Sequence, residues 1–179
     1  MFIKGEKVLL RAIEVSDADI LRDMINDEEI ERMMWGYSFP VARHQQVKWI
    51  ENLSGEKTTF RAMIDVDGTT VGTIILSDID MRNGTAELHI KLAKSSDRGK
   101  GYGTDAVHAL LRYAFQELRL NCVSCRVKED NIASQKLFEK CGFVKEGCLR
   151  QRVYRQGRYY DFYEYSVLNF EYTGKCKCL

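Results

Sequence analysis

The sequence lacks several features that would mark special classes of protein. Only one of its 179 residues, Pro40, is proline, and no apolar run approaches the roughly 18 residues that a membrane span needs. The first seven residues contain no apolar core of a secretory signal. Lys and Arg (27) nearly balance Asp and Glu (26), so no overall positive charge favours nucleic acid. We therefore expect a cytoplasmic protein that binds neither membrane nor nucleic acid.

The composition is typical of one folded domain. Hydrophobic residues make up 45% of the chain and charged residues 30%, which is enough apolar material for a core and excludes disordered and fibrous architectures. A length of 179 residues suits a single domain.

Cysteine is present in an even number, which would permit disulfides. A long chain with its own core in a reducing compartment instead favours six ordinary thiols: Cys122, Cys125, Cys141, Cys148, Cys176 and Cys178. The Cys122-x2-Cys125 pair falls in a predicted strand and would point to opposite faces, which is poor geometry for zinc. No metal site is predicted. The final Cys176–Leu179 segment formally fits a prenylation frame, but Lys177 spoils it, and we interpret it as a tail.

Hydrophobic periodicity predicts an α+β fold. The predicted strands are 7–14, 58–65, 70–76, 85–92, 122–127, 143–149 and 159–170. The predicted helices are 16–26, 43–53, a strongly amphipathic one carrying Ala106 to Leu118, and 131–140. This order indicates a mixed, mostly antiparallel sheet of six to seven strands with about four helices packed on it.

A glycine-rich turn, Asp97 to Thr104, connects the 85–92 strand to the amphipathic helix. Glycines allow backbone N–H groups to converge, and a helix N-terminus adds partial positive charge, so the turn suits a pyrophosphate. A purely structural turn is the alternative. The P-loop pattern fails because Gly101 follows Lys100, and the formal Gly101-x-Gly103-x-x-Ala106 dinucleotide match lacks its βαβ context.

Four segments resemble those of the GNAT superfamily of N-acetyltransferases. Arg98-x-x-Gly101-x-Gly103 resembles the family's pyrophosphate loop for acetyl-CoA, and residues 131–143 look like its second cofactor motif. The opening Leu-Arg-Ala-Ile-Glu-x-x-Asp, residues 10–17, and the segment 146–161 are similar to the RimJ/RimL-like branch. The resemblance implies a GNAT fold over residues 1–172, followed by a tail at 173–179.

The resemblance also implies which residues hold acetyl-CoA. The strand before the turn would bind the pantetheine arm, the turn would hold the pyrophosphate, and the second motif would contact the arm again. The implied cofactor-binding residues are Ile90, Leu92, Arg98, Gly99, Lys100, Gly101, Tyr102, Gly103, Thr104, Asn131, Ser134 and Lys136. A plain helix cap is the alternative for Asn131, and a solvated helix face is the alternative for Lys136.

The candidates for proton transfer lie on the 85–92 strand and in the second cofactor motif. Glu87 occupies the position that often supplies a general base in the family, and a base is useful because only the free amine attacks a thioester. His89 lies on the same predicted strand face and is a second candidate. Phe138 stands where many relatives carry a tyrosine that protonates the leaving thiolate, so Ser134 is only a guess for that catalytic role.

The predicted activity is transfer of acetyl from acetyl-CoA directly to a primary amine, either a protein N-terminus or a small amine. The acidic residues Asp27, Glu28, Glu29 and Glu31 make a polyamine such as spermidine an alternative acceptor, although a solvated helix end would look the same. A non-catalytic acyl-CoA sensor is the alternative from another class, favoured by Phe138. The resemblance also makes a homodimer plausible.

Overall fold

The structure is a computed structural model that describes residues 2–34 and 39–172. Within these residues one sheet of eight strands has the order β1-β2-β3-β4-β5-β6-β8-β7. The strands are β1 (Ile3–Lys4), β2 (Leu9–Arg11), β3 (Phe60–Val66), β4 (Thr69–Asp80), β5 (Thr85–Leu92), β6 (Cys122–Lys128), β7 (Val144–Arg155) and β8 (Arg158–Leu168). The neighbours β5 and β6 run parallel, and the other pairs are antiparallel.

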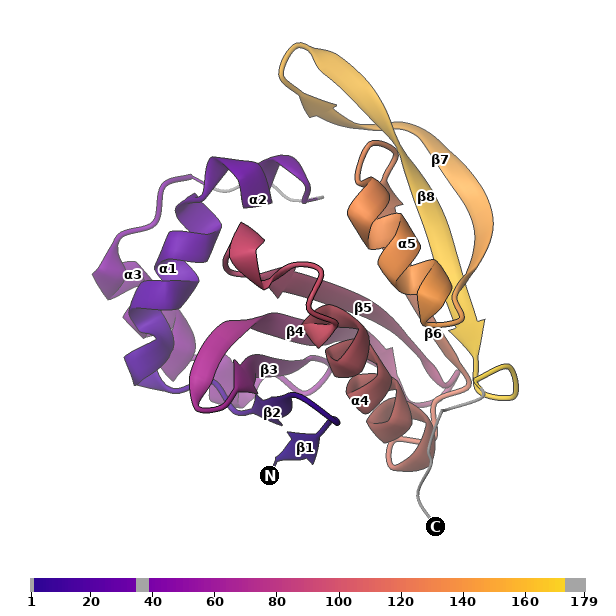
Figure 1. Ribbon diagram of the computed structural model, residues 1–179, viewed down its shortest axis with the longest axis horizontal. Coiled ribbons are helices and arrows are strands. Elements are labelled where there is room, and N and C mark those ends of the chain that lie inside the picture. The colour runs from indigo at the N-terminus through magenta and orange to yellow at the C-terminus, as the bar shows by residue number, and fades with distance from the viewer. Residues whose placement is uncertain (1, 35–38, 173–179) are drawn as a thin grey trace.

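The helices lie in two groups. The described helices are α1 (Ala18–Asn26), α2 (Glu28–Arg32), α3 (Arg43–Glu51), α4 (Tyr102–Gln116) and α5 (Ile132–Lys140). Figure 1 shows α1, α2 and α3 gathered at one side of the molecule and the long β7–β8 hairpin at the other, with α4 and α5 between them. Helix α4 packs against β1, β2 and β5 and also contacts α5.

The main core forms between α4 and the sheet. The predicted apolar stripe is buried from Ala106 to Phe115, whereas Leu118, predicted to end it, lies beyond α4 and is half-buried. The alternation predicted for residues 85–92 is also confirmed in part, since Ala86 and Leu88 join this core. The opposite face of β5 carries Glu87, His89 and Lys91.

The structure adds elements that the sequence pattern did not indicate. The predicted first strand, 7–14, is strand only at Leu9–Arg11, because Asp17 accepts hydrogen bonds from the Glu14 N–H and from Arg11 and turns the chain early. The Asp17 side chain makes no cap bond to the first helix, α1. Helix α2 was not predicted; Asp27 caps it by accepting from the Ile30 N–H, at 2.9 Å.

Several local predictions are confirmed. Asn131 caps α5 by accepting from the Ser134 N–H, and Gly142 follows that helix with φ +91°, a conformation that favours glycine. Phe138 is buried, 4% exposed, with its ring centroid 5.0 Å from that of Phe143. Ala133, on the same helix, is exposed.

The cysteines that the structure describes are free thiols, namely Cys122, Cys125, Cys141 and Cys148. Burial raises the pKa of Cys125 and of Cys141. Cys176 and Cys178 and the predicted tail lie outside the described residues. Across residues 2–34 and 39–172, no helix is long and apolar enough to cross a membrane.

Candidate active site

The sheet opens at its only parallel pair in the described chain. The β5–β6 ladder ends at Glu87↔Ser124, although β5 continues to Leu92 and β6 to Lys128. Beyond that point alternate residues of β5 direct N–H and C=O groups toward β6 without a strand partner. We call the space between the separating ends of β5 and β6 the wedge. Backbone polar groups need hydrogen-bond partners, so the wedge is suited to a ligand that carries amides of its own.

The glycine-rich turn forms one wall beside the wedge. Gly99 (φ +78°) and Gly101 (φ +87°) adopt left-handed conformations, and α4 begins directly afterwards at Tyr102. A Cβ on Gly99 would meet no atom within 4 Å, and one on Gly101 would meet only the flexible end of Lys7. The turn therefore leaves an open hollow at the positive end of a 15-residue helix, where N–H groups can receive an anion.

This turn is braced from the N-terminal hairpin. Asp105, in the first turn of α4, accepts hydrogen bonds from the backbone N–H groups of Glu6, Lys7 and Val8 at 2.6–2.9 Å. The Lys7 ammonium donates to the Lys100 carbonyl at 3.2 Å. These contacts hold the turn and the helix start in place before any ligand arrives.

Helix α5 forms the second wall. Its first residues follow β6 through a tight turn in which the Asn131 N–H donates to the Lys128 carbonyl at 2.9 Å. Lys128 is fully buried, with its ammonium 3.1 Å from the Asp130 carboxylate and over the ring of Tyr160. A buried ammonium needs such partners, and here they fix the turn that positions Asn131 and Ser134.

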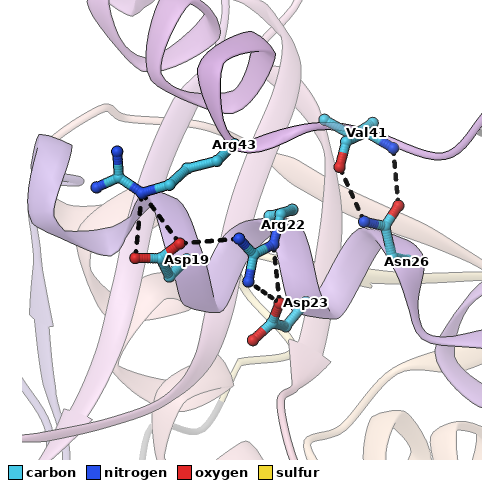
Figure 2. Close-up of polar contacts among 6 residues, drawn as sticks. All are labelled: Asp19, Arg22, Asp23, Asn26, Val41 and Arg43. Atoms are coloured by element: carbon cyan, nitrogen blue, oxygen red, sulfur yellow. Dashed lines mark hydrogen bonds and ion pairs between the residues drawn. The ribbon is translucent and has the colours of Figure 1, made fainter.

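Helix α2 closes the site from the other side. Glu29, Ile30, Met33 and Met34 line it, a contribution that the sequence analysis missed. The 3–4 residue spacing of Ile30, Met33 and Met34 after the Asp27 cap was the available signal. Figure 2 shows that two hydrogen bonds join the end of α1 to the residues before α3, on either side of the segment that carries α2. The Asn26 amide donates to the Val41 carbonyl, and the Val41 N–H donates back to Asn26. Arg43 in turn binds Asp19 of α1.

The three walls enclose a cavity of about 520 Å³, a volume suited to a cofactor-sized ligand. It brings together most of the predicted binding residues: Ile90, Leu92, Arg98, Gly99, Gly101, Tyr102, Gly103, Thr104, Asn131, Ser134 and Lys136. Lys100, Glu87 and His89 do not line it. The Lys100 ammonium lies 3.2 Å from Asp97 and against the ring of Tyr102.

The charged side chains that line the cavity are four cationic ones, Lys91, Arg98, Lys136 and Lys140, and three acidic ones, Glu29, Asp97 and Asp130, so the lining is net positive by one charge. Arg98 pairs with Glu29 at 2.5 Å across the entrance. Lys91 also lines the cavity; burial lowers its pKa, and the nearby Glu31 carboxylate opposes that shift. Lys136 and Lys140 are exposed on α5. An anionic ligand with a long apolar and amide-bearing arm matches this distribution.

Glu87 lies at the point where the strands part. It is 9% exposed, and its two carboxylate oxygens both accept from Arg126 of β6. His89 is two residues further along, with Nε2 3.0 Å from the Ser77 hydroxyl of β4 and 3.9 Å from a Glu87 oxygen. Arg126 and Ser77 were not singled out from the sequence, because only the strand register brings them beside Glu87 and His89.

The chain matches the family model for the acetyltransferase (GNAT) domain over residues 7–144. It is 36% identical to the SPbeta prophage-derived uncharacterized N-acetyltransferase YokL of Bacillus subtilis, over 88% of this chain and 87% of that protein. It is 30% identical to the putative ribosomal N-acetyltransferase YdaF of the same organism, over 96% of each. A solved spermidine N-acetyltransferase from Vibrio cholerae, in complex with CoA and spermine, superposes with a TM-score of 0.87 over 94% of this chain and 99% of that one, at 23% identity.

Proposed function

Because the chain belongs to the GNAT acetyltransferase family and is an N-acetyltransferase, we propose that it moves acetyl from acetyl-CoA directly to a primary amine at the opening between β5 and β6. The observation that carries this proposal is the wedge itself. The strands part after Glu87↔Ser124, and the cavity that continues from the wedge ends at the glycine turn and the α4 N-terminus.

Acetyl-CoA fits the residues present. The turn from Gly99 to Thr104 would hold the pyrophosphate through its N–H groups, aided by Arg98 and the α4 dipole. The open backbone from Ile90 to Leu92 would pair with the pantetheine amides. Asn131, Ser134 and Lys136 would contact the arm from α5, and Lys100 stays a prediction because its side chain is turned to Asp97.

The protein's part in the chemistry is positioning and charge. Holding the amine beside the thioester supplies much of the rate, and a backbone N–H near Leu92 would stabilise the developing oxyanion. The thioester supplies an activated carbonyl and a thiolate leaving group with an ordinary pKa of about 8.5. That leaving group needs little help, which agrees with the buried, hydroxyl-free Phe138. Ser134 lies on the cavity wall and keeps its predicted catalytic role only as a proposal.

The acceptor class follows from the charges on α2. Glu29 and Glu31 are already paired, with Arg98 at 2.5 Å and Arg155 at 3.8 Å. A polyamine would have to displace these arginines to reach both carboxylates. We therefore place an amine with a single positive charge, a protein N-terminus or a small amine, ahead of a polyamine. The acidic α2 at the cavity rim keeps spermidine as the second candidate.

An amine panel tests this proposal. Free CoA release is measured with an N-terminal peptide, simple alkylamines and spermidine, each at equal concentration. We expect turnover with a monoamine or peptide, and acetyl-CoA at about 100 times its Kd should stabilise the fold by about 2.7 kcal/mol. An unshifted melting temperature in millimolar acetyl-CoA would contradict acetyl-CoA binding. Ligand-induced stabilisation without turnover on any amine would indicate the sensor instead.

The homodimer stays a prediction from the family resemblance, and the cytoplasmic location stays a prediction from the sequence composition. The wedge, the turn and the α5 wall described above are formed by residues of one chain.

A further inference from the structure

We propose that His89 accepts the amine proton at its Nδ1 atom, and that Ser77 and Asp78 hold its imidazole in the tautomer that can do so. This inference rests on the proposed function. It differs from the prediction made for Glu87, whose carboxylate is engaged elsewhere.

The tautomer follows from a chain of hydrogen bonds. The Ser77 hydroxyl lies 3.0 Å from the Asp78 carboxylate and 3.0 Å from Nε2 of His89. A hydroxyl has one proton, and an ionised carboxylate is the stronger acceptor and cannot donate. Ser77 therefore donates to Asp78 and accepts from His89. Nε2 must then carry the imidazole proton, which leaves a lone pair on Nδ1.

The backbone makes this chain possible. Asp78 has φ +50° within an irregularity of the β4–β5 ladder between Ser77 and Asp80. In a regular strand the side chains of Ser77 and Asp78 would point to opposite faces. The irregular backbone instead lets the Asp78 carboxylate reach the Ser77 hydroxyl, and so orients the hydroxyl toward His89.

Glu87 is a poor competitor for the proton. Arg126 donates to both of its oxygens, and the Glu87 side chain is only 11% exposed. The guanidinium fork already occupies both carboxylate oxygens as hydrogen-bond acceptors, so an amine would have to compete with Arg126 for them. The His89 side chain, by contrast, is 32% exposed, and the described residues offer its Nδ1 no hydrogen-bond partner.

The charges around His89 suit a group that is neutral at rest and cationic after proton transfer. Burial lowers the pKa of His89; Glu87 and Asp78 oppose that shift, and Arg126 and Lys91 support it. The imidazole is therefore neutral at pH 7 and able to accept. Once protonated, it lies 3.9 Å from the Glu87 carboxylate, which stabilises the new charge.

The proton balance is simple. An acceptor that arrives as an ammonium first releases one proton to solvent. The free amine nitrogen then uses its lone pair to form the bond to the acetyl carbon, and the bond from that carbon to sulfur breaks with its electron pair on the thiolate. The N–H proton that the new amide must lose passes to Nδ1 of His89. His89 then returns it to the thiolate or to water, so the enzyme is unchanged.

The first test reads the tautomer in the free protein. The chain has three histidines, so ¹⁵N-histidine NMR at pH 7.5 can resolve each ring, and the His89→Gln spectrum identifies the His89 signals. In the wild type we expect the imidazole proton of His89 on Nε2. In Ser77→Ala we expect the imidazole to lose this preference for the Nε2-protonated tautomer. Ser77→Thr, which keeps a hydroxyl, should restore it. A proton on Nδ1 would overturn the proposal, whatever the activity of the enzyme.

The second test reads the reaction. His89→Gln should lower kcat by about 10²-fold or more and keep the melting-temperature shift with acetyl-CoA. In the wild type, kcat/KM should fall at or below about pH 6.5 as the imidazole becomes protonated, and we call this fall the acidic limb of the pH profile. His89→Gln should abolish the acidic limb. His44→Gln, on exposed helix α3, is the matched control and should leave all three unchanged. A limb that persists in His89→Gln would overturn the proposal.

Glu87→Gln separates the two candidates for the proton acceptor. Because Glu87 raises the pKa of His89, its loss should move the acidic limb to lower pH and leave the limb present. Disappearance of the limb in Glu87→Gln would assign the proton to Glu87 and overturn our assignment. Failure of the wild type to bind acetyl-CoA or release CoA would instead contradict the proposed function, while the NMR result would stand by itself.

Discussion

The two sides of the candidate site present different kinds of chemical group. The cofactor side, residues 97–104 together with α5, presents mainly backbone N–H groups, a helix terminus and one cap. The polar cluster of Ser77, Asp78, Glu87, His89 and Arg126 instead presents side chains from three neighbouring strands. A backbone site depends on the path of the chain, whereas a side-chain site depends on charge and register. The two should therefore fail in different ways.

The largest change in stability is expected where α5 packs against the hydrophobic core. Phe138 anchors α5 against Phe143 and is 4% exposed, so Phe138→Ala should cost about 3–5 kcal/mol of unfolding free energy. Urea unfolding measures this. Ile132→Ala, on the same helix but 52% exposed, should change stability by less than about 0.5 kcal/mol. A loss below about 1 kcal/mol for Phe138→Ala would contradict the role of this ring as the anchor of α5.

A substitution in the turn should affect ligand binding more than stability. Gly101 has φ +87°, which a β-branched residue adopts only at a cost of about 1–2 kcal/mol. Gly101→Val should therefore redirect the N–H groups of the turn and raise the Kd for acetyl-CoA by about 100-fold, equal to about 2.7 kcal/mol. Calorimetric titration measures the Kd.

Gly147→Val is the control for this change. A Cβ at Gly147 meets nothing within 4 Å, and this residue does not line the cavity. The control should bind acetyl-CoA as the wild type does. A Kd within about threefold of the wild type for Gly101→Val would show that the turn does not hold the pyrophosphate.

The same difference explains how much the sequence could predict. The glycine turn, the start of α4 and the Asn131 cap are each encoded within a few consecutive residues, so their local chemistry was visible before the fold was known. The ion pair between Glu87 and Arg126 joins residues 39 positions apart and depends on which strands are neighbours. No periodicity in one sequence reveals that two strands run parallel for three residues and then separate.

The α2 wall shows a second limit. Its five residues are too few for a reliable periodic signal, and its start depends on one side chain, Asp27, accepting from Ile30. The acidic residues nearby suggested an acceptor for cations. The structure instead pairs Glu29 and Glu31 with arginines that are 69 and 124 positions further along the chain. The composition of the segment was visible in the sequence, but the partners that neutralise it were not.

The smallest effect is expected from one exposed charge in the polar cluster. Asp78→Asn keeps an oxygen that accepts from Ser77, and asparagine tolerates the φ of +50° found there. It removes a negative charge that raises the pKa of His89, so that pKa should fall and the neutral imidazole should persist to lower pH. The acidic limb of kcat/KM should then move to lower pH by less than about one unit, the range for an exposed charge.

Asp67→Asn makes the same change at φ +49° in the β3–β4 turn and should not move the limb. The Kd for acetyl-CoA should stay the same in both variants, because neither side chain lines the cavity. A limb that moves to higher pH, or that moves equally in Asp67→Asn, would contradict the claim that side-chain charge tunes this half of the site.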